Sequence, residues 1–296
     1  MRLPSLAVAG LLLWSPLALA AGAAASYENG LENAVPILRK DGRTSSTSSG
    51  SAARAPRPGA APPAHDPKYF HEPGLTEELG HYDNRYFKGL VPYAEHKSAL
   101  RHLIRSYLTV LASHGVETWL AHGTLLGWWW NGHIMPWDYD LDVQVSAPTL
   151  HWLGRNLNRT THAYEYRDDD DGAGGQVRNK TYLLDVNPHH AELSHGDGQN
   201  VIDARWIDTD NGMFVDITAL TERQPQQQPG VWSCKNFHRY RTIDLYPMRR
   251  TEFEGVPATV PYSFERILTE EYGMKSLVVT EWEGYVFLFL PPSLIC

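Results

Sequence analysis

The stretch Pro136-Trp137-Asp138-Tyr139-Asp140-Leu141-Asp142-Val143-Gln144-Val145 decides how the rest of the chain is interpreted. From Asp138 to Val145 the side chains alternate strictly between polar and apolar. Alternation with a period of two is typical of a half-buried strand, because neighbouring side chains point to opposite faces. At a rise of roughly 3.3 Å per residue, three aspartates project from one face within about 13 Å. The pattern therefore predicts a strand with an acidic face.

Carboxylates this close together repel one another, and each raises the free energy needed to ionise the next. A divalent cation would remove that cost. Carboxylate oxygens are ligands that Mg²⁺ prefers, often together with the phosphates of a substrate. The alternative interpretation is a solvated edge strand whose acidic face binds nothing.

The residues before this stretch favour the metal-binding interpretation. The apolar run from Val116 to Ala121 predicts a short strand, Gly123-Thr124 predicts a turn, and Leu125 to Asn131 predicts a short helix closed by Gly132. A helix N-terminus presents backbone N–H groups without partners in the helix, so it binds anions readily. Placed ahead of an Asp-x-Asp strand, it would hold the phosphates of a nucleotide beside a metal ion.

Residues 121–132, Ala-His-Gly-Thr-Leu-Leu-Gly-Trp-Trp-Trp-Asn-Gly, and residues 136–142 closely resemble the signature of the LicD/fukutin-related family. That family belongs to the polymerase-beta-like nucleotidyltransferase superfamily. The longer run resembles the fungal branch, which is linked to mannosylphosphate transfer onto cell-wall glycans. Further matches at 183–188, 200–208 and 212–218 extend the resemblance over roughly residues 80–285. It implies an α/β (α+β) fold with a mixed, twisted sheet flanked by helices.

The resemblance also implies the composition of the site. Its catalytic carboxylates would be Asp138, Asp140, Asp142 and Asp216. Mg²⁺ or Mn²⁺ would bind to Asp140, Asp142 and Asp216. The phosphates of a nucleotide-sugar donor, GDP-mannose by analogy with the fungal branch, would contact Gly123, Thr124 and Arg205, the last through a bidentate contact.

Asp216 lies between Val215 and Ile217, on a run that predicts a buried strand. A buried charge needs a partner, which a metal ion would supply. The alternative is a structural aspartate bonded to nearby backbone.

The 296 residues carry a formal charge of −8, which argues against a nucleic-acid-binding surface but not against a nucleotide held through a metal. The expected activity is transfer of a sugar phosphate to a glycan hydroxyl, with GMP as the leaving group. Two alternatives stay open. The chain would otherwise be a non-catalytic regulator or partner of a separate mannosylphosphate transferase, or it would transfer another group, such as phosphocholine, ribitol phosphate or a nucleotide.

The amino-terminal residues 1–20 have the pattern of a secretory signal peptide, with Arg2, an apolar run and the small-x-small sequence Ala18-Leu19-Ala20. The alternative is an uncleaved anchor, the one case in which the chain would contact a membrane. Either way the chain would enter the secretory lumen, expected to be the Golgi, with secretion if the signal is cleaved and no partner retains the product. The sequons Asn158-Arg159-Thr160 and Asn179-Lys180-Thr181 are consistent with that address.

Composition divides the remainder of the chain. Residues 21–66 are rich in Ser, Ala, Gly and Pro and predict a disordered stem. Residues 67–285 would form the nucleotidyltransferase-like domain, and residues 286–296 an apolar tail of unassigned role. The two cysteines, Cys234 and Cys296, predict no disulfide framework, and whether they pair is left open.

Local patterns predict four further elements. An apolar stripe predicts an amphipathic helix over 93–114 that ends at Gly115. Ser146 predicts the N-cap of a second helix. Asn211-Gly212, between the β-rich runs 201–208 and 213–217, predicts a hairpin. A last helix is predicted over 261–272, with Pro261 in its first turn.

Two other clusters attract attention by residue type. Four aspartates at 168–171 lie in a glycine-rich run and predict a solvated loop. His189, His190 and His195 are of a type that binds zinc. Without carboxylate or cysteine partners at ligand spacing, they are interpreted as surface or core histidines.

Overall fold

The computed structural model describes residues 68–167, 176–193, 195, 200–279, 281–282 and 285–286, all within one unit that extends from Arg54 to Cys296. The predicted signal peptide and stem, the acidic run at 168–171 and the apolar tail beyond Val286 lie outside these residues. Within the described part of the chain, none of the helices combines the length and the hydropathy needed to cross a bilayer.

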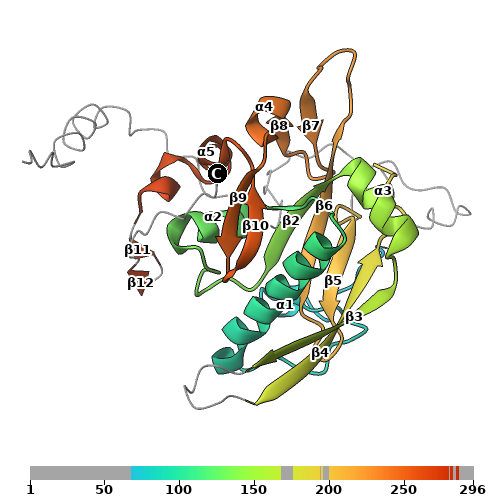
Figure 1. Cartoon of the computed structure of the whole chain (residues 1–296), viewed down its shortest axis with the longest axis vertical. Coiled ribbons are helices and arrows are strands. Elements are labelled where there is room, and N and C mark those ends of the chain that lie inside the picture. The colour runs from blue at the N-terminus through green and yellow to red at the C-terminus, as the bar shows by residue number, and fades with distance from the viewer. Residues whose placement is uncertain are drawn as a thin grey trace, which may run out of the picture. The chain divides into compact units, whose positions relative to one another are not determined.

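A mixed sheet forms the centre of the domain (Figure 1). Its main path runs in the order β1 (Trp119–Leu120), β2 (Leu141–Ser146), β6 (Phe214–Glu222), β5 (Ala204–Asp208), β4 (Val177–Val186) and β3 (Thr160–Arg167). β7 (Val231–Ser233) pairs with the end of β6, and β8 (Arg239–Arg241) pairs with β7. β2 and β6 are parallel, and the other pairs of this sheet are antiparallel. The mixed sheet predicted from the family resemblance is thus confirmed.

One face of the sheet forms the hydrophobic core under helix α1 (Tyr93–Ser113). The apolar side chains of β2 on this face are fully buried, and Tyr107 of α1 lies edge-on to Trp206 of β5. The helix ends where the sequence predicts. Gly115 adopts a φ of 66°, and its N–H donates to the carbonyl of Ala112, while Val116 N–H donates to Leu111. This is the Schellman arrangement, which satisfies carbonyls that the helix itself leaves without partners.

Helix α3 (Ala147–Asn156) packs against β2, β4 and β6. Its predicted N-cap is confirmed, because the Ser146 hydroxyl accepts a hydrogen bond from Thr149 N–H at 3.2 Å. The predicted hairpin is confirmed as well. β5 and β6 pair in register from Ala204 opposite Ile217, and Gly212 turns the chain between them with a φ of 89°.

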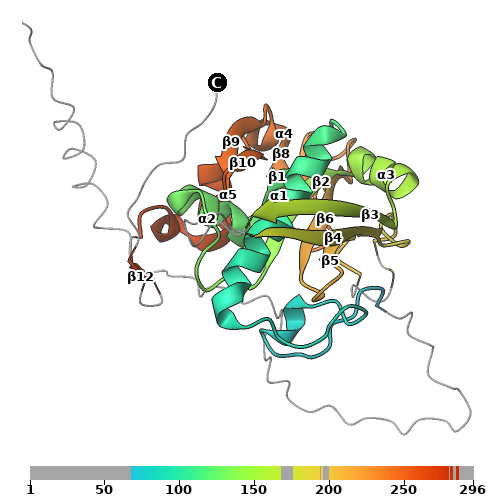
Figure 2. The ribbon, with the colours of Figure 1, turned by 60° about the horizontal axis from the view of Figure 1, so that its bottom comes forward.

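The opposite face of the sheet is polar along one row. Strand register places Asp142 of β2, Asp216 of β6, Arg205 of β5 and Asp185 of β4 side by side. Partners in register project from the same face of a sheet. The segment that begins at residue 68 runs along this face, on the lower side of the sheet in Figure 2, and includes the short 3₁₀ helix η3 (Leu79–His81). Four strands therefore bring charged residues together beneath one covering segment.

A smaller layer completes the domain around α2 (His122–Asn131). The chain after β8 forms α4 (Thr242–Leu245), the hairpin β9 (Arg249–Phe253) and β10 (Val256–Val260), α5 (Phe264–Tyr272) and η5 (Met274–Leu277). A last hairpin pairs β11 (Glu281–Trp282) with β12 (Tyr285–Val286). The indole N–H groups of three consecutive tryptophans attach α2 to this layer, and their acceptors are Thr251 Oγ1, Leu277 O and Ser276 O.

Four predicted boundaries are wrong. β2 begins at Leu141 rather than Asp138, because Leu141 is the first residue with a partner, Val215, on the neighbouring strand. β1 is confined to Trp119–Leu120 for the same reason, since only these residues pair with β2. α2 begins at His122 instead of Leu125 and so includes the predicted Gly-Thr turn. α5 begins at Phe264 instead of Pro261, after an N-cap at Ser263.

Candidate active site

The three aspartates of the Asp-x-Asp-x-Asp run lie where the chain enters β2. Asp138 and Asp140 belong to the connection from α2, and Asp142 is the second residue of the strand. Glycine at position 123 permits the approach of Asp138, because a Cβ there would lie only 3.2 Å from Asp138 Oδ2. Gly127 similarly lets the connection fold back on α2, since its Cβ would lie 2.6 Å from His133 O. The two glycines of the motif therefore place the carboxylates against the helix.

A tyrosine hydroxyl lies among these carboxylates. Burial raises the pKa of Tyr272 well above its usual value, and four carboxylates raise it further: Glu271, Asp142, Asp138 and Asp140. The hydroxyl therefore stays protonated at neutral pH and can donate a hydrogen bond to an acceptor such as a carboxylate. Tyr272 ends α5, more than a hundred residues after the motif, and sequence reasoning did not identify it.

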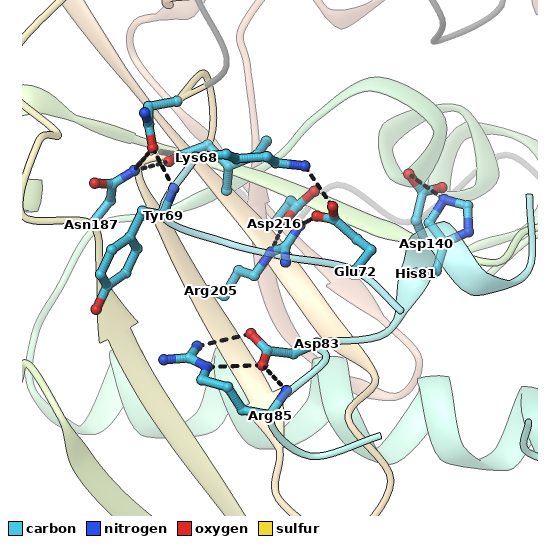
Figure 3. A network of polar contacts seen from close by, with 12 residues as sticks. Lys68, Tyr69, Glu72, His81, Asp83, Arg85, Asp140, Asn187, Arg205 and Asp216 are labelled. Atoms are coloured by element: carbon cyan, nitrogen blue, oxygen red, sulfur yellow. Dashed lines mark hydrogen bonds and ion pairs between the residues drawn. The ribbon is translucent and has the colours of Figure 1, made fainter. Parts of the chain in front are cut away.

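Asp140 also faces the segment that covers the sheet. The His81 Nε2 atom lies 3.7 Å from Asp140 Oδ2, as Figure 3 shows. The His81 ring stacks over Tyr139 with 6.3 Å between the ring centres and 17° between their planes. The end of η3 thus contacts the acidic run directly.

Asp216 shares a face with Asp142, as the prediction requires, because the two residues are register partners on parallel strands. Asp216 is buried, and its Oδ1 accepts a hydrogen bond from Arg205 Nε at 2.9 Å (Figure 3). The buried charge therefore has an ionic partner, an arginine side chain on the adjacent strand. Neither a backbone bond nor a metal is needed to explain why it is stable there.

Arg205 is almost completely buried and binds two carboxylates. Besides Asp216, its Nη2 donates to Glu72 Oε1 at 2.7 Å, and its guanidinium lies 3.6 Å from the centre of the Phe214 ring. Burial by itself raises the pKa of Glu72, but Arg205 and Lys68 outweigh burial and hold that pKa below its usual value. In this structure Arg205 is engaged within the protein, and a contact with a donor phosphate stays a prediction.

The predicted phosphate contacts of Gly123 and Thr124 fall in the first turn of α2. The first hydrogen bond of the helix runs from Leu125 N to Ala121 O at 3.1 Å, so the N–H groups before it have no partner in the helix. The Thr124 side chain is 3% exposed, and its hydroxyl accepts a hydrogen bond from Asp142 N–H at 2.8 Å. Thr124 thus links the helix terminus to the acidic strand, while its backbone N–H remains the group suited to a phosphate.

A second polar network adjoins the same helix terminus. His122, the first residue of α2, adopts a φ of 50°, and its Nδ1 lies 2.9 Å from Glu271 Oε2. Tyr240 donates to the other oxygen of Glu271 at 2.8 Å. Burial by itself raises the pKa of Glu271, but the contact with His122 and its neighbours brings the pKa below the usual value. A non-glycine residue held in the left-handed region next to a candidate site is a strained position that the surrounding bonds maintain.

The donor set of Asp140, Asp142 and Asp216 consists of hard carboxylate oxygens, which fits Mg²⁺ or Mn²⁺. Within the described ranges, however, these three residues do not form a group whose ligand atoms all lie within 4.8 Å of one another. Arg205 occupies one oxygen of Asp216. Carboxylates suited to Mg²⁺ or Mn²⁺ therefore lie near one another, but they do not form a complete coordination site in this structure.

Comparison with known proteins identifies the family. The model of the LicD/FKTN/FKRP nucleotidyltransferase domain matches residues 115–263, which include the motif at α2, the acidic run and Asp216. The chain belongs to this family. The LicD match begins just before β1 and ends just before α5, so it covers all the strands of the main sheet.

Relatives of this LicD protein come from fungi and mammals. It is 30% identical over 231 residues to mannosyltransferase regulator 4, and 35% identical over 167 residues to mannosyltransferase regulator 14, both of Saccharomyces cerevisiae. It is 27% identical over 176 residues to the ribitol 5-phosphate transferase FKRP of Homo sapiens. These alignments cover 76%, 54% and 59% of this chain, but only 18%, 17% and 31% of the three relatives. The relatives are thus named as regulators of mannosyltransferases or as a ribitol 5-phosphate transferase, and this chain spans less than a third of the length of each.

Proposed function

We propose that this protein transfers a sugar phosphate from a nucleotide-linked donor to a glycan hydroxyl, with the help of a bound divalent cation. The observation that supports this most is the register of Asp142 beside Asp216 on adjacent parallel strands, directly after Asp138 and Asp140. Phosphoryl transfer depends on positioning and on neutralising negative charge, which carboxylate-bound metal ions do. The placement of these four residues beside a helix N-terminus suits that chemistry.

In the proposed reaction, the oxygen of an acceptor hydroxyl forms a bond to the phosphorus next to the sugar. The bond from that phosphorus to the bridging oxygen breaks, and a nucleoside monophosphate leaves with the bridging oxygen. Asp138 would accept the proton of the attacking hydroxyl. Asp140, Asp142 and Asp216 would hold Mg²⁺ or Mn²⁺, which when bound supplies positive charge to the attacking and leaving oxygens.

Two other groups would act on the same reactants. The N–H groups of Gly123 and Thr124 would donate to the donor phosphates, as at other helix N-termini. The Tyr272 hydroxyl, kept neutral by burial and by neighbouring carboxylates, would donate a hydrogen bond to one aspartate and fix its orientation.

GDP-mannose is the first donor to test, because two relatives are named as mannosyltransferase regulators. A nucleotide-linked ribitol phosphate is the second, because a relative with 27% identity is named as a ribitol 5-phosphate transferase. Purified protein would be incubated with each donor, Mn²⁺ and a glycan acceptor, and released nucleoside monophosphate would be quantified. Release from one donor that requires both the acceptor and Mn²⁺ is the expected result.

The matched variants are Asp142→Asn and Asp210→Asn. Both remove one negative charge, but Asp210 lies exposed in the β5–β6 turn, away from the acidic run. Loss of nucleotide release in the first variant alone supports catalysis at the proposed site. Equal activity in the two variants would exclude Asp142 from the reaction.

A regulatory role is the second candidate, and the names of the two yeast relatives favour it. A regulator would release no nucleotide alone and would raise the activity of a separate mannosylphosphate transferase. Asp142→Asn separates the two candidates, because a regulator keeps its stimulating effect without that carboxylate. A transferase loses all activity.

We also propose that the domain acts in the lumen of the secretory pathway, in the Golgi. Both sequon asparagines are exposed, Asn158 after α3 and Asn179 on β4. Expression in a eukaryotic host followed by endoglycosidase treatment tests the address. A product that keeps Met1 and shows no change in mass would contradict it.

A further inference from the structure

A second group of possible metal ligands lies far along the chain from the acidic run, in the connection that follows β4. His189, Glu192 and His195 are spaced three residues apart, and each offers one ligand atom within 4.8 Å of the other two. The sequence-based interpretation of these histidines assumes that no carboxylate lies at ligand spacing. Glu192 is such a carboxylate, so that premise is wrong.

The ligand atoms of the group lie close to one another. The Nδ1 atom of His189 lies 3.3 Å from Glu192 Oε1, and the Nδ1 atom of His195 lies 2.9 Å from Glu192 Oε2. The two imidazole rings are stacked, with 3.4 Å between centres and 8° between planes. Ligands bound to zinc at about 2.0–2.1 Å in tetrahedral geometry lie about 3.3 Å apart. Each Nδ1 atom thus lies at nearly this spacing from a carboxylate oxygen. Because an ion lies in the plane of an imidazole that binds it, the two parallel rings would turn about their Cβ–Cγ bonds to direct both Nδ1 atoms at one ion.

Buried amides support the connection that carries the group. Asn187 is 0% exposed, and its Oδ1 accepts a hydrogen bond from His189 N–H at 2.9 Å. The Asn187 Nδ2 group donates to Asn200 Oδ1 at 3.1 Å, and Asn200 is also buried. Glu192 N–H donates to the carbonyl of His189 at 3.0 Å. Buried side chains therefore hold the backbone that carries the three ligand residues. In metal sites, hydrogen bonds from residues outside the ligand set orient the ligands in the same way.

The charges around the group also permit a cation. Among the described residues, Lys235 is a cation bonded to the group: its ammonium donates to His189 O at 2.9 Å and forms an ion pair with Asp203 at 3.0 Å. Lys235 therefore binds the backbone of His189 and has its own counter-ion.

We propose that His189, Glu192 and His195 bind a first-row transition-metal ion, with zinc as the reference ion. Imidazole nitrogen suits zinc, copper and nickel, whereas Mg²⁺ and Ca²⁺ take oxygen ligands. Two imidazoles and one carboxylate are the ligand set of open zinc sites, which keep a fourth position for water or another group. This site has a different ligand chemistry from the all-carboxylate site at β2. The zinc proposal does not depend on the transferase function proposed for the β2 site.

Zinc binding to the whole chain, prepared without a polyhistidine tag and stripped with a chelator, tests the proposal. Isothermal titration with Zn²⁺ in excess Mg²⁺ should show one tight site per chain. Replacing one ligand, in His189→Gln, Glu192→Gln or His195→Gln, should weaken zinc binding by at least about tenfold, as even loss of a supporting partner does. Co²⁺ should give the intense visible absorption of a tetrahedral site, and Glu192→Gln should abolish it.

His190→Gln is the matched control, because His190 lies in the same connection but contacts His151 Nδ1 at 3.0 Å. Unchanged zinc affinity in this variant, and in Asp142→Asn, supports a site made of the three named residues. Equal weakening in His190→Gln would show diffuse binding by surface histidines and overturn the proposal. No zinc uptake by the wild-type chain, or uptake unchanged in Glu192→Gln, would overturn it as well. The Glu192 side chain is 58% exposed, so its replacement should not unfold the protein.

Discussion

Replacing Asp216 by valine should destabilise the protein severely, and the structure gives the reason. The Arg205 and Asp216 side chains are 3% and 6% exposed and are joined by a 2.9 Å hydrogen bond. Removing one partner of a buried ion pair costs about 3–5 kcal/mol, because the other charge is left uncompensated. Arg205 would keep its 2.7 Å contact with Glu72, so the loss should lie near the lower end of that range.

Urea unfolding followed by tryptophan fluorescence measures the effect. Asp216→Val should lower the free energy of unfolding by about 3 kcal/mol, with a lower midpoint and an unchanged m-value. For a domain of this size that loss corresponds to a fall in Tm of about 6–12 °C.

The double variant Arg205→Met, Asp216→Val tests whether the loss of stability comes from the uncompensated charge of Arg205. Replacing both members of a buried ion pair by apolar residues is often neutral or stabilising. The double variant should therefore be more stable than Asp216→Val alone. The reasoning is refuted if Asp216→Val costs less than about 1 kcal/mol, or if adding Arg205→Met lowers the stability further.

Three other outcomes are expected. Asp142→Asn should abolish nucleotide release yet shift Tm by only a few degrees, because Asp142 is less buried than Asp216; a large loss of Tm would instead show a structural role. Gly127→Ala should cost about 1–3 kcal/mol through its 2.6 Å approach to His133 O, whereas Gly80→Ala, with nothing within 4 Å, should be neutral in the same urea assay. The free energy of unfolding should fall as the pH drops below about 6.5, because burial lowers the folded-state pKa of three histidines and the unfolded chain then binds more protons than the folded chain. Each histidine lowers this free energy by at most about 1.4 kcal/mol per pH unit. They are His96, His162 and His238, and a urea midpoint that does not change between pH 7.5 and 5.5 would contradict this.

Much of the candidate site was predictable because the sequence patterns that indicate it span only a few neighbouring residues. The Asp-x-Asp-x-Asp run identifies an acidic strand entrance within a few residues, and Asp216 was found because a carboxylate between two apolar strand residues needs a partner. What could not be found was the identity of that partner. Arg205 meets Asp216 through the register of β5 and β6, and Glu72 reaches Arg205 from a segment 133 residues away. Tyr272 and Glu271 carried no local signal either, because they reach the site only through the packing of α5.

The sequence by itself determined those features whose physics is local. The Gly115 helix end, the Ser146 N-cap, the Asn211-Gly212 turn and the alternation within β2 each depend on backbone preferences or hydrogen bonds between near neighbours. Only the tertiary structure decided where β2 begins and which charge compensates Asp216. These depend on strand register and on side chains held in place from distant segments, and neither composition nor periodicity encodes which residues will meet.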